Sequence, residues 1–360
     1  MRHENSPGSY AVCESASMPK SFTLYVRTVD KVVAYPIQKH KERGFFVSVN
    51  SSFSSIQELI ESYRQEAGEL GIKLTRPCLV PVHRNEIDRK NLKLLKKLSS
   101  GQFSETWQGL LCGKSVVIKR PPIKTNEGLH LNFLHEADII QKLAHNNIIR
   151  LLGVSTNRHP HYIIMEYMAN GNLKEYLSSG DGNCLEEQQI ITMAAQVASG
   201  MVQLELSNRI HRDLAARSIL VGENNLCKIS SFRYAQDNRH SGYDVMTTPV
   251  VKWSAPEVLS ATAYSIKSDI WSFGVVLFEM ITHGQTPYAD MTDQEVTQKV
   301  VNENYRIPFP QNCPERLYSM MLHCWKVDPI SRPTFETLQW QLEDYYTLKD
   351  DYLYGYTEAT

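Results

Sequence analysis

The sequence predicts an α+β protein built from two folded parts and a short tail. Residues 1–78 alternate apolar and polar side chains in short runs, and a helical pattern follows near residues 56–63. Residues 79–90 carry prolines and charges, which predicts a linker. Residues 91–345 start with strand-like runs and continue with mostly helical ones, whereas residues 346–360 form a polar, Tyr-rich tail.

The first part is expected to contain three strands and one helix. The strands are predicted at Ser9–Val12, Ser21–Val26 and Gly44–Val49, where apolar or aromatic residues alternate with polar ones. The helix is predicted at Ile56–Tyr63, where apolar residues recur at helical spacing.

Two helices of the second part stand out. Gln188–Leu206 carries its apolar residues at helical spacing. Ile270–Ile281 is the longest apolar stretch, but Ser272 and Glu279 interrupt it and it is shorter than the roughly 20 residues of a membrane span. We therefore expect a buried helix there, and we expect no membrane anchor in this chain.

Composition excludes several classes of function. The formal net charge is −1, so neither a nucleic-acid footprint nor attraction to a membrane surface is indicated. The 7 cysteines are odd in number and none is spaced C-x-x-C, which argues against a disulfide framework or a zinc site. Reduced thiols of this kind predict a cytoplasmic protein.

Several motifs of the second part carry chemistry and occur in a fixed order. They are Val116–Lys119, His211–Ser218, Ala255–Glu257 and Asp269–Gly274. In this order they resemble the signatures of protein kinases. The resemblance implies a two-lobed kinase fold, with a small β-rich lobe and a large α-helical lobe, and an ion pair between Glu257 and Arg332.

Two segments narrow the resemblance to tyrosine kinases. Ala215–Arg217 lies in the catalytic loop, and Pro249–Trp253 precedes the Ala-Pro-Glu motif. Both are similar to non-receptor tyrosine kinases of the Src and Fyn-related type.

The resemblance implies a role for each matching residue. Lys119 would grip the ATP phosphates and pair with Glu136, Asp213 would be the catalytic base, and Arg217 would steer a substrate phenol. The remaining ATP contacts would come from Gly101 of the phosphate loop and from Glu166 and Met168 of the hinge. We favour a structural explanation for the survival of the ion pair and the loop residues over a role in catalysis.

Both expected metal ligands are missing. Ser218 stands where kinases of this pattern carry an Asn, and Ser231 stands where they carry an Asp. Neutral hydroxyls are poor ligands for a hard dication, so the sequence predicts no metal site and makes Mg²⁺ doubtful. Arg233, in place of a Gly, adds a positive charge, and we expect it to point into solvent.

The nucleotide pocket also departs from the pattern. Of the three phosphate-loop glycines Gly101 alone survives, and each replacing serine restricts the backbone angles. Thr106 and Val117 change the walls expected around adenine, and Met165 narrows the back of the pocket. ATP binding is therefore expected to be weak.

The first part resembles a Src homology 2 (SH2) domain over Ser9–Ser15 and the strands that follow. In that family an Arg in the first motif contacts phosphotyrosine with two hydrogen bonds, but Cys13 stands here. Ala34 and Pro36 replace a His and a Lys of the same pocket. Phosphotyrosine binding is not expected. Because the family's opening strand and helix are missing, the domain is expected to be partial, and an SH3 module upstream is left open.

Tyr243 and Tyr352 lie where Src-type kinases carry regulatory phosphorylation sites. The function predicted from all of this is a pseudokinase that binds proteins of tyrosine-kinase signalling, active kinases among them. The alternative is a weak or atypical ATP-dependent tyrosine kinase that keeps Lys119, Asp213 and Arg217 at work. A third hypothesis is a decaying gene product without a function.

Overall fold

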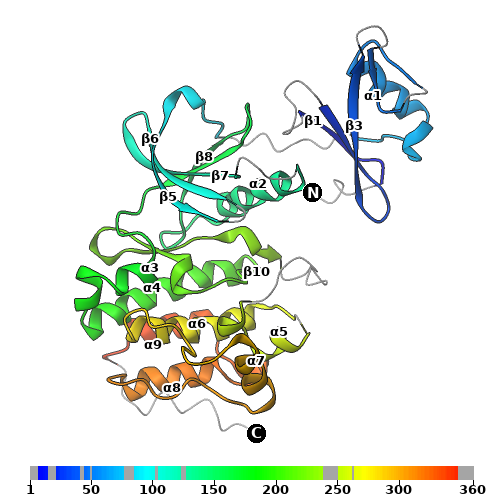
Figure 1. Ribbon diagram of the computed structural model, residues 1–360. Coiled ribbons are helices and arrows are strands. Elements are labelled where there is room, and N and C mark those ends of the chain that lie inside the picture. Colours follow the sequence, from blue (N-terminus) through cyan, green and yellow to red (C-terminus); the bar gives the residue numbers. More distant parts are fainter. Residues whose placement is uncertain are drawn as a thin grey trace.

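A computed structural model describes residues 7–14, 22–40, 44–48, 51–76, 85–101, 104–122, 127–237, 250–261 and 263–347. The first part is a four-stranded antiparallel sheet with one helix (Figure 1). Its elements are β1 (Tyr10–Glu14), β2 (Phe22–Arg27), β3 (Val32–His40), β4 (Gly44–Phe46) and α1 (Ile56–Gln65). The predicted strands and helix are present with ends shifted by up to three residues, and β3 was not predicted from alternation.

This first part has its own core. Leu24 and Val26 of β2 are fully buried and belong to one apolar cluster with Leu59 and Tyr63 of α1. The helix begins where the Ser55 hydroxyl accepts a hydrogen bond from the Glu58 amide, a typical N-cap. Alternate residues of β2 therefore face the helix, and the others face away from it.

The β-rich lobe is a five-stranded antiparallel sheet in the order β5-β6-β7-β9-β8, with α2 beside it (Figure 1). Its elements are β5 (Leu92–Ser100), β6 (Glu105–Leu111), β7 (Lys114–Arg120), α2 (Glu127–Lys142), β8 (Leu151–Ser155) and β9 (Tyr162–Glu166). Val116 and Ile118 face an apolar cluster on one side of the sheet, whereas Val117 joins the main core on the other. Lys119, two residues after Val117, lies on this second side.

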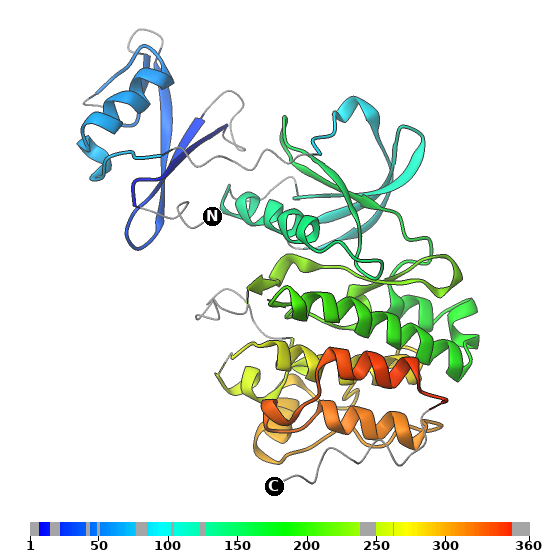
Figure 2. The same ribbon diagram turned by 180° about the vertical axis from the view of Figure 1, so that it is seen from behind.

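The helical lobe follows (Figure 2). Its helices are α3 (Leu173–Leu177), α4 (Glu187–Leu206), α5 (Pro256–Ala261), α6 (Ile266–Ile281), α7 (Asp293–Asn302), α8 (Glu315–Cys324) and α9 (Phe335–Glu343). Among the described residues, two small antiparallel ribbons complete it, β10 (Arg209–Ile210) with β13 (Gln236–Asp237) and β11 (Ile219–Val221) with β12 (Cys227–Ile229).

Short 3₁₀ helices occur in several described parts of the chain. They lie at Gly68–Leu70, Arg89–Asn91, Gly180–Cys184, Ala216–Ser218, Glu223–Asn225, Phe232–Tyr234, Val251–Trp253 and Pro329–Ser331.

Helix α6 is the centre of the large lobe, as its apolar sequence predicts. Its first turn is closed by the Ser265 hydroxyl, which accepts hydrogen bonds from the Lys267 and Ser268 amides. Gly274 allows α8 to approach closely, because a Cβ there would lie only 2.6 Å from Trp325 Nε1. Among the described residues, no helix is both long and apolar enough to cross a membrane.

The ion pair expected between Glu257 and Arg332 is confirmed. The Arg332 guanidinium donates to both Glu257 oxygens, at 2.7 and 2.8 Å, and the arginine side chain is fully buried. This bidentate geometry ties the start of α5 to the loop before α9. The exact domain boundaries at residues 78, 90 and 345 stay predictions.

Candidate active site

The expected pair of Lys119 and Glu136 joins the sheet to α2. Lys119 Nζ donates to Glu136 Oε2 at 2.5 Å, and the two side chains are 14% and 4% exposed. Thr106 is the cross-strand neighbour of Lys119, and Met165 is that of Val117. Because directly paired residues share a face, all of these side chains lie on the side of the sheet that carries the lysine.

The predicted hinge residues lie at the end of β9 and just after it, where the chain leads to the large lobe. The Glu166 carboxylate accepts hydrogen bonds from Lys228 Nζ at 2.8 Å and from the Arg150 amide at 2.7 Å. The Met168 side chain is 7% exposed and lies close to Gly222, where a Cβ would meet Met168 Cε at 3.1 Å. The Glu166 side chain is thus engaged within the protein, and the hinge is bonded to β12 of the large lobe.

The phosphate-loop region is a hairpin between β5 and β6. Ser99 and Ser100 are paired with Thr106 and Glu105 in the ladder, and the Gly101 amide donates to the Ser104 carbonyl at 2.9 Å. A Cβ on Gly101 would make only an ordinary contact, at 3.5 Å from that carbonyl oxygen. The turn at Gly101 therefore does not require glycine.

The segment His211–Ser218, predicted to be the catalytic loop, is anchored on α6. The backbone amides of His211 and Arg212 donate to the two oxygens of Asp269, at 2.6 and 3.0 Å. Burial lowers the pKa of His211, so its ring is neutral. Its Nε2 lies 2.9 Å from the Ser230 carbonyl and donates to it, and its Nδ1 accepts from the Asp213 amide at 3.3 Å.

The predicted base, Asp213, is paired with Arg217. Arg217 Nη2 donates to Asp213 Oδ1, and the carboxylate-bearing side chain is 17% exposed. The Arg217 guanidinium also lies 4.5 Å from the centre of the Trp253 ring. The structure thus brings together the two catalytic-loop residues that the sequence singled out.

One functional candidate was missed from the sequence. Glu279 is fully buried on α6, and its Oε2 accepts from the Trp253 indole at 2.9 Å and from the Ala216 amide at 2.8 Å. Burial raises the pKa of Glu279. The Glu279 carboxyl therefore fixes the indole ring of Trp253, and this ring is the one that the Arg217 guanidinium contacts. The signal was present in the sequence, since a glutamate that interrupts a buried apolar helix needs partners.

The first metal-ligand position is occupied by a buried hydroxyl. Ser218 is 1% exposed, and its Oγ donates to the Asp213 carbonyl oxygen at 2.6 Å. Its own carbonyl accepts from the amide and the hydroxyl of Ser230, at 2.8 and 2.9 Å. The Ser218 hydroxyl is therefore used for a hydrogen bond within the loop, from its end at Ser218 back to Asp213.

The second metal-ligand position keeps an unusual backbone. Ser231 is half-buried with φ 66° and ψ 44°, the left-handed region that favours Gly, Asn and Asp over Ser. The next residue, Phe232, is fully buried and packs edge-on against His211 with ring centres 5.3 Å apart. The segment is thus packed inward although its carboxylate is absent.

Arg233 is half-buried, which corrects the expectation of a side chain in solvent. Its guanidinium lies 5.3 Å from the centre of the Tyr234 ring. Burial lowers the pKa of Arg233, while Tyr234 and Glu136 act in the opposite direction. The reason for the difference is the inward packing of Phe232, which carries the next residue toward α2. Among the described residues, no group of three or more His, Cys, Asp or Glu could hold a metal ion.

In the first part, strand register aligns the three predicted pocket positions. Cys13 pairs with Thr23, and Thr23 pairs with Pro36. Cys13, Thr23 and Pro36 therefore form one row across the sheet. Ala34 lies two residues from Pro36 and therefore on the same face, which is opposite the face that packs on α1. The side chain of Cys13 lies outside the described part of the chain, as do Tyr243 and Tyr352.

Comparisons with known proteins agree with this architecture. Residues 92–342 match the protein tyrosine and serine/threonine kinase family, and residues 1–63 match the SH2 domain family. The human tyrosine-protein kinase FRK is 42% identical, over 97% of this chain and 72% of its own length. The tyrosine-protein kinase SRK2 of Spongilla lacustris is 41% identical, over 94% of this chain and 97% of its own length. The predicted fold class is confirmed, and the chain belongs to the non-receptor tyrosine kinases, with an SH2 domain followed by a kinase domain.

Proposed function

We propose that this chain is a pseudokinase, which acts by binding other proteins. The observation that carries the proposal is the use of Ser218, which is 1% exposed and donates its hydroxyl to the Asp213 carbonyl. Ser231 offers another neutral hydroxyl in place of a carboxylate. Kinases of this family generally use ATP and Mg²⁺, and Mg²⁺ prefers carboxylate and phosphate oxygens. The residues present at these two positions do not fit the ion.

The loss of the metal ligands is large enough to matter. A bound metal supplies several kcal/mol of charge stabilisation in phosphoryl transfer, and ~4 kcal/mol is roughly a thousandfold in rate. We infer that nucleotide binding is weak as well. Lys119 is in place to contact the phosphates, and Glu166 and Met168 remain at the predicted hinge. On the same face of the sheet as Lys119, however, Thr106 and Val117 alter the walls of the pocket expected to hold adenine.

A thermal melt with ATP tests this proposal. A ligand at ~100 times its Kd stabilises by about 2.7 kcal/mol, a shift of roughly 5–10 °C for a domain of this size. We expect no shift that depends on Mg²⁺, measured with Mg²⁺ and again with EDTA. The matched variant is Ser218→Asn with Ser231→Asp, which should gain such a shift. A Mg²⁺-dependent shift in the unchanged chain would overturn the proposal.

A weak or atypical tyrosine kinase is the alternative. It is favoured by the contacts that remain, the pair of Lys119 with Glu136 and that of Asp213 with Arg217. This alternative predicts phosphate transfer from ATP to a poly-Glu/Tyr peptide that Asp213→Asn abolishes and Lys119→Met lowers. Such activity would refute the pseudokinase proposal, and its absence in the unchanged chain would refute the alternative.

The SH2 family binds phosphotyrosine proteins, and we propose that this member has lost that contact. The proposal rests on Cys13 and on the shared face of Pro36 and Ala34. Titration with a phosphotyrosine peptide should give no measurable binding, and Cys13→Arg should restore some of it, because Arg alone adds a bidentate donor. Submillimolar binding by the unchanged chain would contradict the proposal. If phosphotyrosine binding is lost, as proposed, other surfaces of the chain would recognise its partners, and active tyrosine kinases are among the partners that we propose.

Two further parts of the proposal rest on sequence. A cytoplasmic location follows from the cysteine pattern, and the described cysteines are free thiols. Regulation through Tyr243 and Tyr352 follows from the family resemblance.

A further inference from the structure

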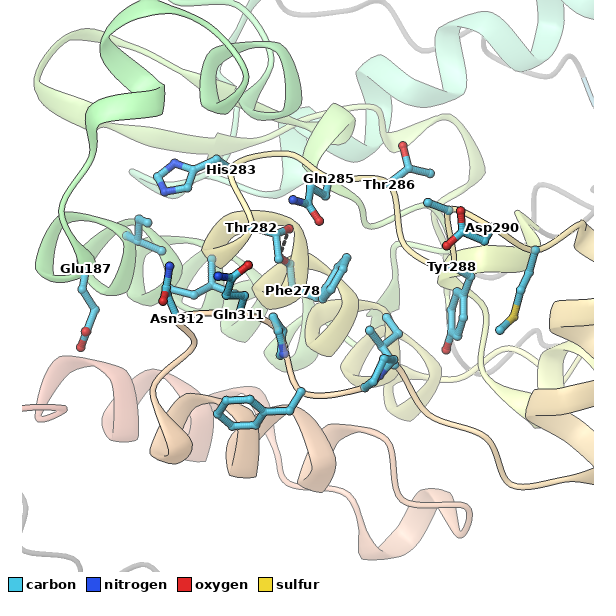
Figure 3. Close-up of a pocket in the computed structure, with 18 of the residues that line it drawn as sticks. Glu187, Phe278, Thr282, His283, Gln285, Thr286, Tyr288, Asp290, Gln311 and Asn312 are labelled. Atoms are coloured by element: carbon cyan, nitrogen blue, oxygen red, sulfur yellow. Dashed lines mark hydrogen bonds between the residues drawn. The ribbon is translucent and has the colours of Figure 1, made fainter.

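A cavity of about 610 Å³ opens in the large lobe (Figure 3), and none of the candidate active-site residues described above lines it. It lies among the start of α4, the end of α6 and the segments 283–291 and 305–312. Its buried lining residues are apolar or aromatic: Leu185, Ile190, Phe278, Tyr288, Ile307 and Pro310. We call this cavity the groove. Its volume is within the range of about 300–1,000 Å³ typical of ligand sites.

The rim of the groove determines which occupants it accepts. Glu187 lies at one end and Asp290 at the other (Figure 3), and both are exposed. None of the described residues that line the groove is Lys or Arg. Phe309, also in the lining, is 49% exposed. The groove therefore suits a neutral aromatic or aliphatic segment and disfavours an anion.

The chain itself leaves the folded lobe at this place. Tyr346 Oη donates to Glu187 Oε1 at 3.1 Å, so the end of the described chain touches a rim residue of the groove. Just before it, Tyr345 is 4% exposed, and its carbonyl accepts a hydrogen bond from Arg316. The Arg316 guanidinium also lies 4.8 Å from the centre of the Tyr345 ring. These contacts fix the point from which the rest of the tail starts.

We propose that the groove is the docking site of the chain's own tail, with the aromatic segment Tyr352–Tyr356 as its occupant. This segment reads Tyr-Leu-Tyr-Gly-Tyr and carries no charge, so it brings no anion to the acidic rim. Tyr352 is six residues beyond Tyr346, and an extended chain spans up to ~3.3–3.6 Å per residue, so about 20 Å is within reach.

Docking of this kind would respond to phosphorylation of the tail. A phosphotyrosine carries about −1.5 to −2 charges at neutral pH. The groove holds Glu187 and Asp290 and offers no Lys or Arg among its described lining residues. Phosphorylation of Tyr352 should therefore release the tail, and kinases that act on it would expose the groove to other proteins.

Amide hydrogen exchange on the full chain tests the proposal. The probe is the exchange rate of segments 285–291 and 305–312, which line the groove. Replacing the three tail tyrosines with Ala should speed exchange there about tenfold, the order expected when one buried aromatic anchor is lost. The matched control replaces the same tyrosines with Phe, which keeps the rings and should leave the protection in place. Equal exchange in all three proteins would overturn the proposal.

A second measurement approaches the contact from the side of the groove. Chymotrypsin should cut the tail of the Phe309→Ala variant about tenfold faster than that of the unchanged chain, because an exposed anchor of the groove is gone. Ile330→Ala is the control, since Ile330 is 86% exposed and does not line the groove. Equal cleavage rates would refute docking. Protection that increases with protein concentration would assign the groove to the tail of a second copy and overturn the intramolecular proposal.

Discussion

The pair of Lys119 and Glu136 allows a direct test of whether a surviving kinase feature is structural. The change is Lys119→Met, which removes the cation and keeps much of the apolar stem. Glu136 is 4% exposed and accepts from the lysine at 2.5 Å, so the variant leaves a carboxylate buried without its partner. Breaking a buried pair costs about 3–5 kcal/mol. Because Lys119 itself is 14% exposed, we expect the lower end, about 3 kcal/mol.

The assay is thermal and urea unfolding without nucleotide. A loss of about 3 kcal/mol lowers the Tm of a domain of this size by roughly 6–12 °C. The matched control is the double variant Lys119→Met with Glu136→Leu, which removes both charges and should recover to within about 1 kcal/mol of the unchanged chain. A loss below about 0.5 kcal/mol for Lys119→Met would refute the structural role. If that variant instead abolished a stabilisation by ATP, the lysine would serve the nucleotide.

Three further changes test the fold. Glu257→Ala should cost about 3 kcal/mol in urea unfolding, because Arg332 is fully buried and loses both of its charged contacts, whereas a cost below 1 kcal/mol would contradict this. Gly274→Ala should cost about 1–2 kcal/mol, since overlap with Trp325 exceeds the gain in helix propensity, and a more stable variant would show that α8 yields. The pKa of Glu105 is lowered to about 2, and the largest cause is the hydrogen bond that it accepts from Lys97. Because this pKa is depressed, the stabilisation is present above pH 4.5 and is lost as the pH falls toward 2. Glu105→Gln should thus cost about 1 kcal/mol at pH 7 and much less near pH 2, where the folded protein also protonates this carboxylate, and an equal cost at both pH values would contradict the ion pair.

The sequence alone determined the fold class and the partners of the main ion pairs. The longest apolar stretch, Ile270–Ile281, predicted the buried helix α6, because it is too short to span a membrane and so apolar a segment must be covered by the rest of the protein. The kinase motifs predicted that Glu257 would meet Arg332, 75 residues away, and that Lys119 would meet Glu136. The loss of both expected metal ligands, an Asn replaced by Ser218 and an Asp replaced by Ser231, was also visible in the sequence, since residue identity needs no coordinates.

The tertiary structure alone decided how the replaced residues are used. The direction of the Ser218 hydroxyl depends on the Asp213 carbonyl, and the burial of Arg233 depends on the packing of Phe232 against His211. Glu279 gained its role only when two distant donors reached its carboxyl. The groove is likewise formed by segments from α4, α6 and two later loops. Hydrogen-bond direction, burial and cavity shape are properties of non-local packing, and no local pattern of residues encodes them.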